Sequence, residues 1–133
     1  MGALSGVRVL DLTNVLSGPF CTLHLALLGA EVVKIENPKA GDLARVLGNV
    51  PKFNKMLMGT RFLAQNAHKK SLTLNLQSAE GKEIFRKLVA GADVVVLPLH
   101  EIDFAAMPSG RPHIVSYAAK WDEAHVDYAG TKP

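Results

Sequence analysis

Six positively charged side chains lie in a stretch of the chain that contains no acidic residue. The stretch runs from residue 43 to residue 79. Its cations are Arg45, Lys52, Lys55, Arg61, Lys69 and Lys70, with His68 beside the last two. Fixed cations without neighbouring carboxylates are typical of a surface that meets an anion. The stretch predicts a phosphorylated small molecule, a nucleic acid or an acidic protein surface as partner, and a solvated basic face without a ligand is the alternative.

A second candidate site is the loop of residues 13–17, because of the elements that flank it. Residues 7–12 form a nearly continuous apolar run, typical of a strand that is buried on both faces. Apolar residues then recur at helical spacing from Phe20 to Gly29, and residues 31–36 indicate a second strand. This order predicts a right-handed βαβ unit with parallel strands. Such sheets bind ligands beyond the carboxyl ends of their strands, so the loop is a candidate binding loop.

The same alternation of strand and helix returns later in the chain. Residues 71–76 indicate a strand, Ser78 is the expected cap of a helix that ends at Gly91, and residues 93–97 indicate a further buried strand. Asp42 is the expected cap of a short helix at 43–47. Residues 49–67 lack periodicity and indicate a long loop with one helical turn. We also expect a strand at 113–118, and the pattern is too weak in residues 119–133 to predict order there.

Composition indicates one globular domain over residues 1–133. Of these, 48% are hydrophobic and 20% are charged, which suits a packed core rather than a disordered chain. We expect an α/β fold with a Rossmann-like parallel sheet built from βαβ units. The sequence shows neither a signal peptide nor a membrane span, and one cysteine excludes a disulfide framework, so a cytoplasmic location is expected. Cys21 is expected to be a small buried core residue rather than a reactive thiol.

The common cofactor and catalytic motifs are absent from the sequence. No G-x-G-x-x-G or G-x-x-x-x-G-K-[ST] segment occurs, which removes the usual dinucleotide and P-loop phosphate cradles. No G-x-S-x-G segment occurs, which disfavours an α/β-hydrolase. The single cysteine and five dispersed histidines fit no zinc spacing, and no metal is expected.

Two long stretches nevertheless resemble one family. GVRVLDLTNVLSGPF…LLGAEVVKIENPKAGDLAR and NAHKKSLTLNLQSAEGKEIFRKLVAGADVVV are similar, in this order, to the N-terminal part of the class III coenzyme A transferases. That family includes formyl-CoA and carnitine CoA-transferases and α-methylacyl-CoA racemases. The resemblance covers about residues 4–96. It implies a CoA thioester as substrate, a Rossmann-like large domain of which this chain holds an incomplete part, and interlocked dimers of full-length chains.

The resemblance also assigns CoA contacts, from the loop after the first strand, the family's N-x-N-K turn and neighbouring positions. These candidates are Val15, Leu16, Ser17, Asn37, Arg45, Asn66, His68, Lys69, Lys70 and Lys120. Asn37 stands where the family often has an arginine over the nucleotide, so Lys39 or Arg45 would replace that contact. We expect the basic residues, with Lys69 foremost, at the 3′-phospho-ADP end of CoA.

For catalysis the resemblance leaves one candidate in this chain. Family transferases attack the acyl-CoA with an aspartate in a G-D motif, and family racemases use a histidine in a G-H-D segment. AHVDY (124–128) is similar to the histidine segment, which makes His125 a candidate. Asp122 and Asp127 lack the flanking glycine of the nucleophile. We therefore expect the chain to bind acyl-CoA, to be inactive alone, and to work in a homo-oligomer or in a complex with a chain that carries the rest of the fold.

Three other functions stay open. The chain could be a non-catalytic CoA-binding or regulatory fragment, an α-methylacyl-CoA racemase-like domain, or a nucleic-acid-binding α/β domain that uses the basic stretch. Few aromatic residues lie among the cations of that stretch, which disfavours nucleic acid as the ligand.

Overall fold

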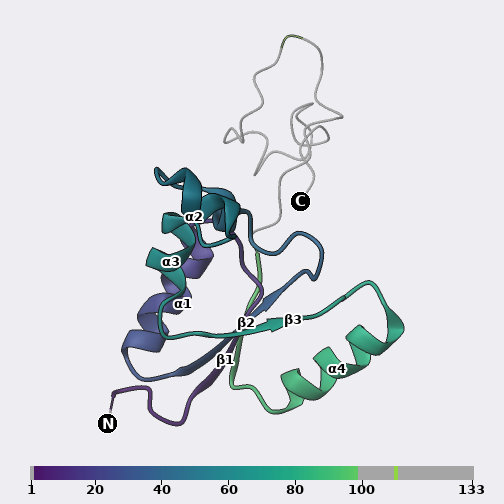
Figure 1. The fold of residues 1–133 in the computed structure, drawn as a ribbon. Coiled ribbons are helices and arrows are strands. Elements are labelled where there is room, and N and C mark those ends of the chain that lie inside the picture. The colour runs from purple at the N-terminus through teal and green to yellow at the C-terminus, as the bar shows by residue number, and fades with distance from the viewer. Residues whose placement is uncertain (1, 99–109, 111–133) are drawn as a thin grey trace. The chain divides into compact units, whose positions relative to one another are not determined.

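A parallel sheet forms the centre of the fold (Figure 1). The computed structural model describes residues 2–98 and residue 110. Its strands are β1 (Arg8–Asp11), β2 (Glu31–Glu36), β3 (Lys70–Thr73) and β4 (Val94–Val96). They lie in the order β3-β2-β1-β4, and all three pairings are parallel. The predicted α/β class, with a parallel sheet built from βαβ units, is confirmed.

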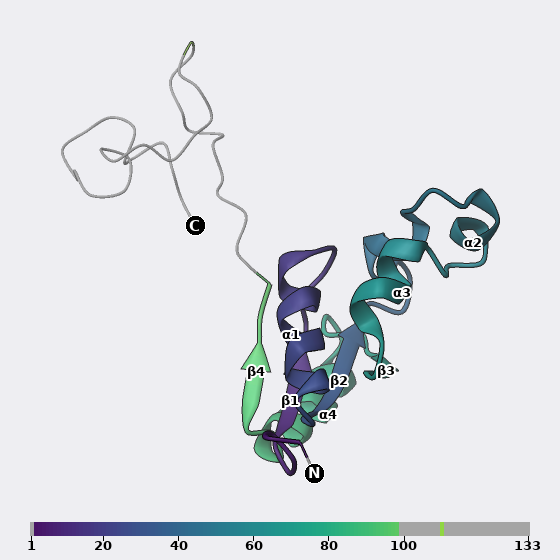
Figure 2. The same cartoon turned by 90° about the vertical axis from the view of Figure 1, so that its left-hand side faces the viewer.

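Helices cover both faces of the sheet (Figures 1 and 2). Helices α1 (Ser17–Leu27) and α3 (Thr60–Asn66) lie together on one face, and α4 (Ala79–Ala90) lies on the other. Successive residues of β1 point to opposite faces, so Val9 packs in the core beneath α1 and Leu10 in the core beneath α4. Phe85 and Leu88 of α4 pack against the Leu10 cluster. This double covering explains the nearly continuous apolar run of residues 7–12, which contains β1.

Two predicted helix caps are confirmed. Oδ1 of Asp42 accepts from the backbone N–H of Ala44 at 2.8 Å and caps the 3₁₀ helix η1 (Leu43–Val46). Oγ of Ser78 accepts from the backbone N–H of Gly81 at 3.0 Å and caps α4. Both side chains satisfy a backbone donor that the helix itself leaves unpaired.

The segment 49–67 is not the long loop that its sequence indicates. It contains α2 (Pro51–Lys55) and α3, and the prediction of a single helical turn is wrong. Proline at the first position favours the start of α2, which buries no side chain, whereas α3 buries Phe62. Helices this short with so few buried residues show no helical period in the sequence.

Cys21 also differs from its prediction. It is exposed on α1, because the buried side of this helix consists of Pro19, Thr22 and Leu23. The strand expected at 113–118, the tail 119–133, Lys120 and His125 lie outside the described residues. Within the described part of the chain, no helix has both the length and the apolar character that crossing a membrane requires.

Candidate functional site

An open pocket lies where the strands end. It has a volume of about 300 Å³ and is formed largely by residues that follow the strands. Its lining includes Leu12, Asn14, Asn37, Leu74, Leu76, Gln77 and Pro98. The walls are mainly apolar, with three side-chain amides among them. This is the edge at which open parallel sheets bind ligands, and Asn14 belongs to both the pocket and the candidate loop 13–17.

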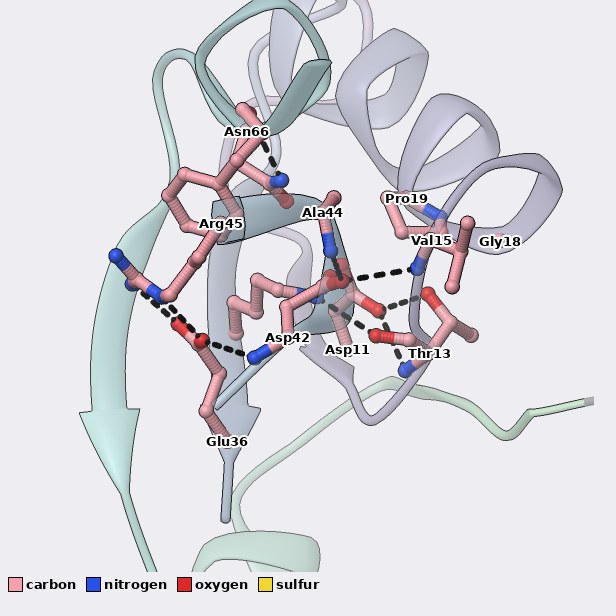
Figure 3. A network of polar contacts seen from close by, with 12 residues as sticks. Asp11, Thr13, Val15, Gly18, Pro19, Glu36, Asp42, Ala44, Arg45 and Asn66 are labelled. Atoms are coloured by element: carbon pink, nitrogen blue, oxygen red, sulfur yellow. Dashed lines mark hydrogen bonds and ion pairs between the residues drawn. The ribbon is translucent and has the colours of Figure 1, made fainter. Parts of the chain in front are cut away.

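The candidate loop contains a backbone conformation that its sequence disfavours. Val15 has φ of +68°, in the left-handed region that β-branched residues rarely adopt. Its N–H donates to Oδ1 of Asp42 at 3.0 Å, across 27 residues of sequence (Figure 3). The same oxygen accepts from Ala44, so one carboxylate fixes both the loop after β1 and the turn after β2.

Lys34 of β2 supplies the countercharge of Asp42. Its Nζ lies 2.9 Å from Oδ2 of Asp42 and donates to the carbonyl oxygen of Thr13 at 2.7 Å. The two side chains are 1% and 0% exposed. Burial tends to raise the pKa of Asp42, but hydrogen bonds from Lys34 and from two backbone N–H groups outweigh it and keep the pKa below its ordinary value. Asp42 is therefore a charged carboxylate in the interior.

Lys69 lies in a second buried cluster, beneath the start of α1. Its Nζ is within 3.0 Å of four oxygens, and its side chain is 1% exposed. The four are Oδ2 of Asp11, the carbonyl of Pro19, Oγ1 of Thr22 and Oδ1 of Asn66. An ammonium group has three protons, so these acceptors occupy all of its donors. The lysine and Asn66 thus tie the turn after α3 to α1 instead of facing a phosphate.

Arg45 is held in a third pair. Its Nε and Nη2 each lie 2.7 Å from one oxygen of Glu36, in a bidentate arrangement (Figure 3). Its guanidinium also lies 3.8 Å from the centre of the Phe62 ring. Glu36 is 3% exposed and accepts from the backbone N–H of Asp42 at 2.9 Å. Arg45 therefore joins β2 to α3 and to the turn that carries Asp42.

The other sequence-derived candidates are exposed but do not lie together. Leu16 and Ser17 are exposed at the start of α1, and Asn37 is exposed in the pocket wall. His68 is exposed in the turn between α3 and β3. Lys70 begins β3, at the amino end of the sheet, and its Nζ lies 3.2 Å from Glu31.

Half of the basic stretch is therefore occupied by the protein's own carboxylates. The cations of α2 and α3, which are Lys52, Lys55 and Arg61, are exposed and pair with no carboxylate among residues 2–98. Lys34 is a buried charged residue that was not among the residues predicted from the sequence. A lysine in the middle of the buried run EVVKIE was the available signal, since a buried charge requires a partner.

Comparison with known proteins decides the family. The family model described as CoA-transferase family III matches residues 4–114. The chain belongs to CoA-transferase family III. The resemblance found in the sequence is thereby confirmed.

Similarity to individual proteins agrees with this assignment. Formyl-CoA:oxalate CoA-transferase from Escherichia coli is 44% identical over 98 residues, which are 73% of this chain and 23% of the relative. Crystal structures of a hypothetical protein from Mycobacterium tuberculosis and of a CAIB/BAIF family protein from Brucella suis match with TM-scores of 0.62 and 0.61, at 39% and 37% identity. Each match covers 71% of this chain and 25% of the solved one. This family III chain spans about a quarter of the length of these relatives.

Within residues 2–98 of this family III chain, no group of three or more His, Cys, Asp or Glu side chains is arranged to hold a metal ion. The groups that the described part offers to a ligand are the pocket at the carboxyl ends of the strands, the exposed start of α1 and the exposed cations.

Proposed function

We propose that this chain is the CoA-thioester-binding part of a class III CoA-transferase, which moves CoA between carboxylic acids. The observation that carries the proposal is the family match over residues 4–114, together with a pocket beside the loop 13–17 at the ligand-binding edge of the sheet. The pocket suits the adenine ring of CoA, because apolar walls accept a flat ring and the amides can pair with its polar edge. Formyl-CoA and oxalate, which name the relative in Escherichia coli, are the first donor and acceptor to test.

The phosphates of CoA need cations that face solvent. Lys69 is enclosed, so Lys39 is the better candidate. It is exposed in the loop after β2, between Asn37 and Gly41, which both line the pocket. We propose that Lys39 takes the position of the arginine that the family often has over the nucleotide.

The attacking carboxylate is the part of the chemistry that the described residues do not offer. Asp11, Glu36 and Asp42 lie near the carboxyl ends of the strands, but each is at most 3% exposed and paired with a cation. A covalent transfer needs a carboxylate that reaches the thioester carbonyl. We propose that it comes from residues outside the described part or from a partner chain, and that His125 is a candidate acid/base residue.

CoA is expected to raise the melting temperature of the chain, and duplex DNA to raise it much less. Replacing Lys39 by alanine should weaken CoA binding by at least ~10-fold, because a hydrogen bond to a charged group contributes roughly 1.5–3 kcal/mol. Isothermal calorimetry measures this affinity.

Lys87→Ala is the matched control, since Lys87 is an exposed lysine on α4 that pairs with Glu83. It should leave the affinity for CoA unchanged. Stabilisation by DNA rather than by CoA would instead favour the nucleic-acid alternative, and equal losses for Lys39→Ala and Lys87→Ala would remove Lys39 from the site.

We also propose that the chain works in an oligomer or a heteromeric complex. A group of large apolar side chains is exposed around η1, α2 and α3. Its members are Leu43, Val46, Val50, Phe53, Met56, Leu57, Met58 and Leu63. Many large apolar side chains exposed on neighbouring elements are typical of contact with another protein.

Sedimentation velocity at micromolar concentration is expected to show a species larger than the monomer. Introducing charge by Leu57→Lys should shift the population toward monomer, because a lysine in an apolar contact loses its hydration without a partner. Ile84→Lys on α4 is the control, because Ile84 is similarly exposed. This substitution should not change the proportion of monomer. A monomer for the native chain at these concentrations contradicts the proposal for self-association.

A further inference from the structure

Val15 combines a β-branched side chain with a left-handed backbone conformation. A β-branched residue in the left-handed region is a genuine outlier, which persists only where the surroundings hold it. The residue lies in the loop that the proposed function assigns to CoA. Other parts of the chain must therefore hold this loop before a ligand binds.

The bonds that hold it come from β2 and from the turn that follows. On the amino side of Val15, the carbonyl of Thr13 accepts from Nζ of Lys34 at 2.7 Å. On Val15 itself, the N–H donates to Oδ1 of Asp42 at 3.0 Å. Asp42 and Lys34 then pair with each other at 2.9 Å. A closed circuit of three contacts thus surrounds the strained residue.

A helix cap alone does not account for Asp42. Capping η1 requires one acceptor for Ala44, which serine, threonine or asparagine provides as well as aspartate does. Asp42 accepts a second backbone N–H and pairs with a lysine that is 1% exposed. Burying both charges costs desolvation energy, which their attraction offsets only when the pair is well aligned and its other polar atoms are hydrogen-bonded.

We propose that Asp42, acting with Lys34, is a positioning residue for CoA binding: it holds Val15 in the left-handed conformation and so shapes the loop 13–17 in advance. The inference rests on the proposed function, since it concerns the same loop. A loop that is already in its bound conformation loses less freedom on binding, and affinity rises accordingly.

A double-mutant cycle tests this role through the affinity for CoA. Asp42→Ala should weaken CoA binding by at least ~10-fold in the native background. The loss should be at most ~3-fold in the Val15→Gly background, because glycine adopts the left-handed conformation without help. Where Asp42→Ala does not fold, Asp42→Asn replaces it. Asn keeps an acceptor for the N–H of Val15 but loses the ion pair with Lys34, so the affinity for CoA should fall about 3-fold in the native background. In the Val15→Gly background the same substitution should not change the affinity.

Asp93→Ala is the matched control. Oδ2 of Asp93 accepts a backbone N–H, that of Arg8, at 2.8 Å, at the amino end of the sheet. Its removal should not change the affinity in either background. The inference is overturned if the Asp42 substitution lowers the affinity for CoA equally with valine and with glycine at position 15. A purely structural role of Asp42 predicts the same loss in both backgrounds.

Amide hydrogen exchange separates this inference from the proposed function. The N–H of Val15 should be protected in the ligand-free native chain and lose protection in Asp42→Ala. A native chain that does not bind CoA overturns the proposed function, whereas the protection of Val15 still decides whether Asp42 holds the loop. An unprotected Val15 in the native chain overturns the inference even if CoA binds.

Discussion

Replacing Lys69 by methionine is expected to destabilise the fold by about 3–5 kcal/mol, the usual cost of removing one partner from a buried ion pair. The reason is Asp11, which is 0% exposed and would be left as an uncompensated charge. Thr22 and the carbonyl of Pro19 would each lose a contact as well. The free energy of unfolding from urea titrations, followed by circular dichroism, measures the loss.

Lys70→Met is the control for this substitution. Lys70 is the next residue along the chain, its side chain is 68% exposed, and its partner Glu31 is also exposed to solvent. A surface change of this kind stays within about 0.5 kcal/mol. Adding Asp11→Asn to Lys69→Met should recover part of the stability, because the unpaired charge disappears. A Lys69→Met protein that keeps native stability but loses affinity for CoA would contradict the structural role. It would instead support a contact between Lys69 and the phosphates of CoA.

The free energy of unfolding is expected to fall as the pH drops below about 4.5. Burial tends to raise the pKa of Asp11, but hydrogen bonds from Thr13 and Thr22 and the charge of Lys69 outweigh it, so the pKa stays below its ordinary 3.8. For Glu36, burial is likewise outweighed by Arg45 and by the N–H of Asp42, and the pKa stays below 4.5. The pKa of Asp42 is also lowered.

The direction in which pH changes the stability follows from proton binding. The unfolded chain takes up protons at these three carboxylates at a higher pH than the folded chain does, so lowering the pH favours unfolding. Their stabilising contribution is complete above about pH 5 and is lost as the pH falls through the ordinary values and then through the lowered ones. Each unit by which a pKa is lowered corresponds to about 1.4 kcal/mol.

Unfolding free energies from pH 7 to pH 3 test this dependence. Asp42→Asn should give a shallower fall, because one of the three buried carboxylates is gone. Asp93→Asn, which also removes one carboxylate but leaves the three buried ones in place, is the control for the change in net charge. A native stability that is flat between pH 5 and pH 3 would contradict the prediction.

The sequence predicts the elements whose pattern is long and regular, and the two caps. It does not predict α2 and α3, because these short helices are fixed by contacts with other parts of the chain. The interior position of Lys69 depends on Asp11, 58 residues earlier, and no local pattern encodes that pairing. Burial of Lys34 could have been inferred from its strand, whereas its pairing with Asp42 and the resulting conformation of Val15 require the three-dimensional arrangement.

The strand order has a consequence for how the chain is made. Strand β1 lies between β2 and β4, yet β4 follows β1 by more than 80 residues. A ribosome adding roughly 5–20 residues per second completes β4 on the order of ten seconds after β1. During that interval the backbone donors and acceptors of β1 that later pair with β4 are open to other chains. The emerging polypeptide is therefore open to misassociation along this edge of β1 until residues 94–96 can pair with it, and a chaperone that shields the edge would act in this window.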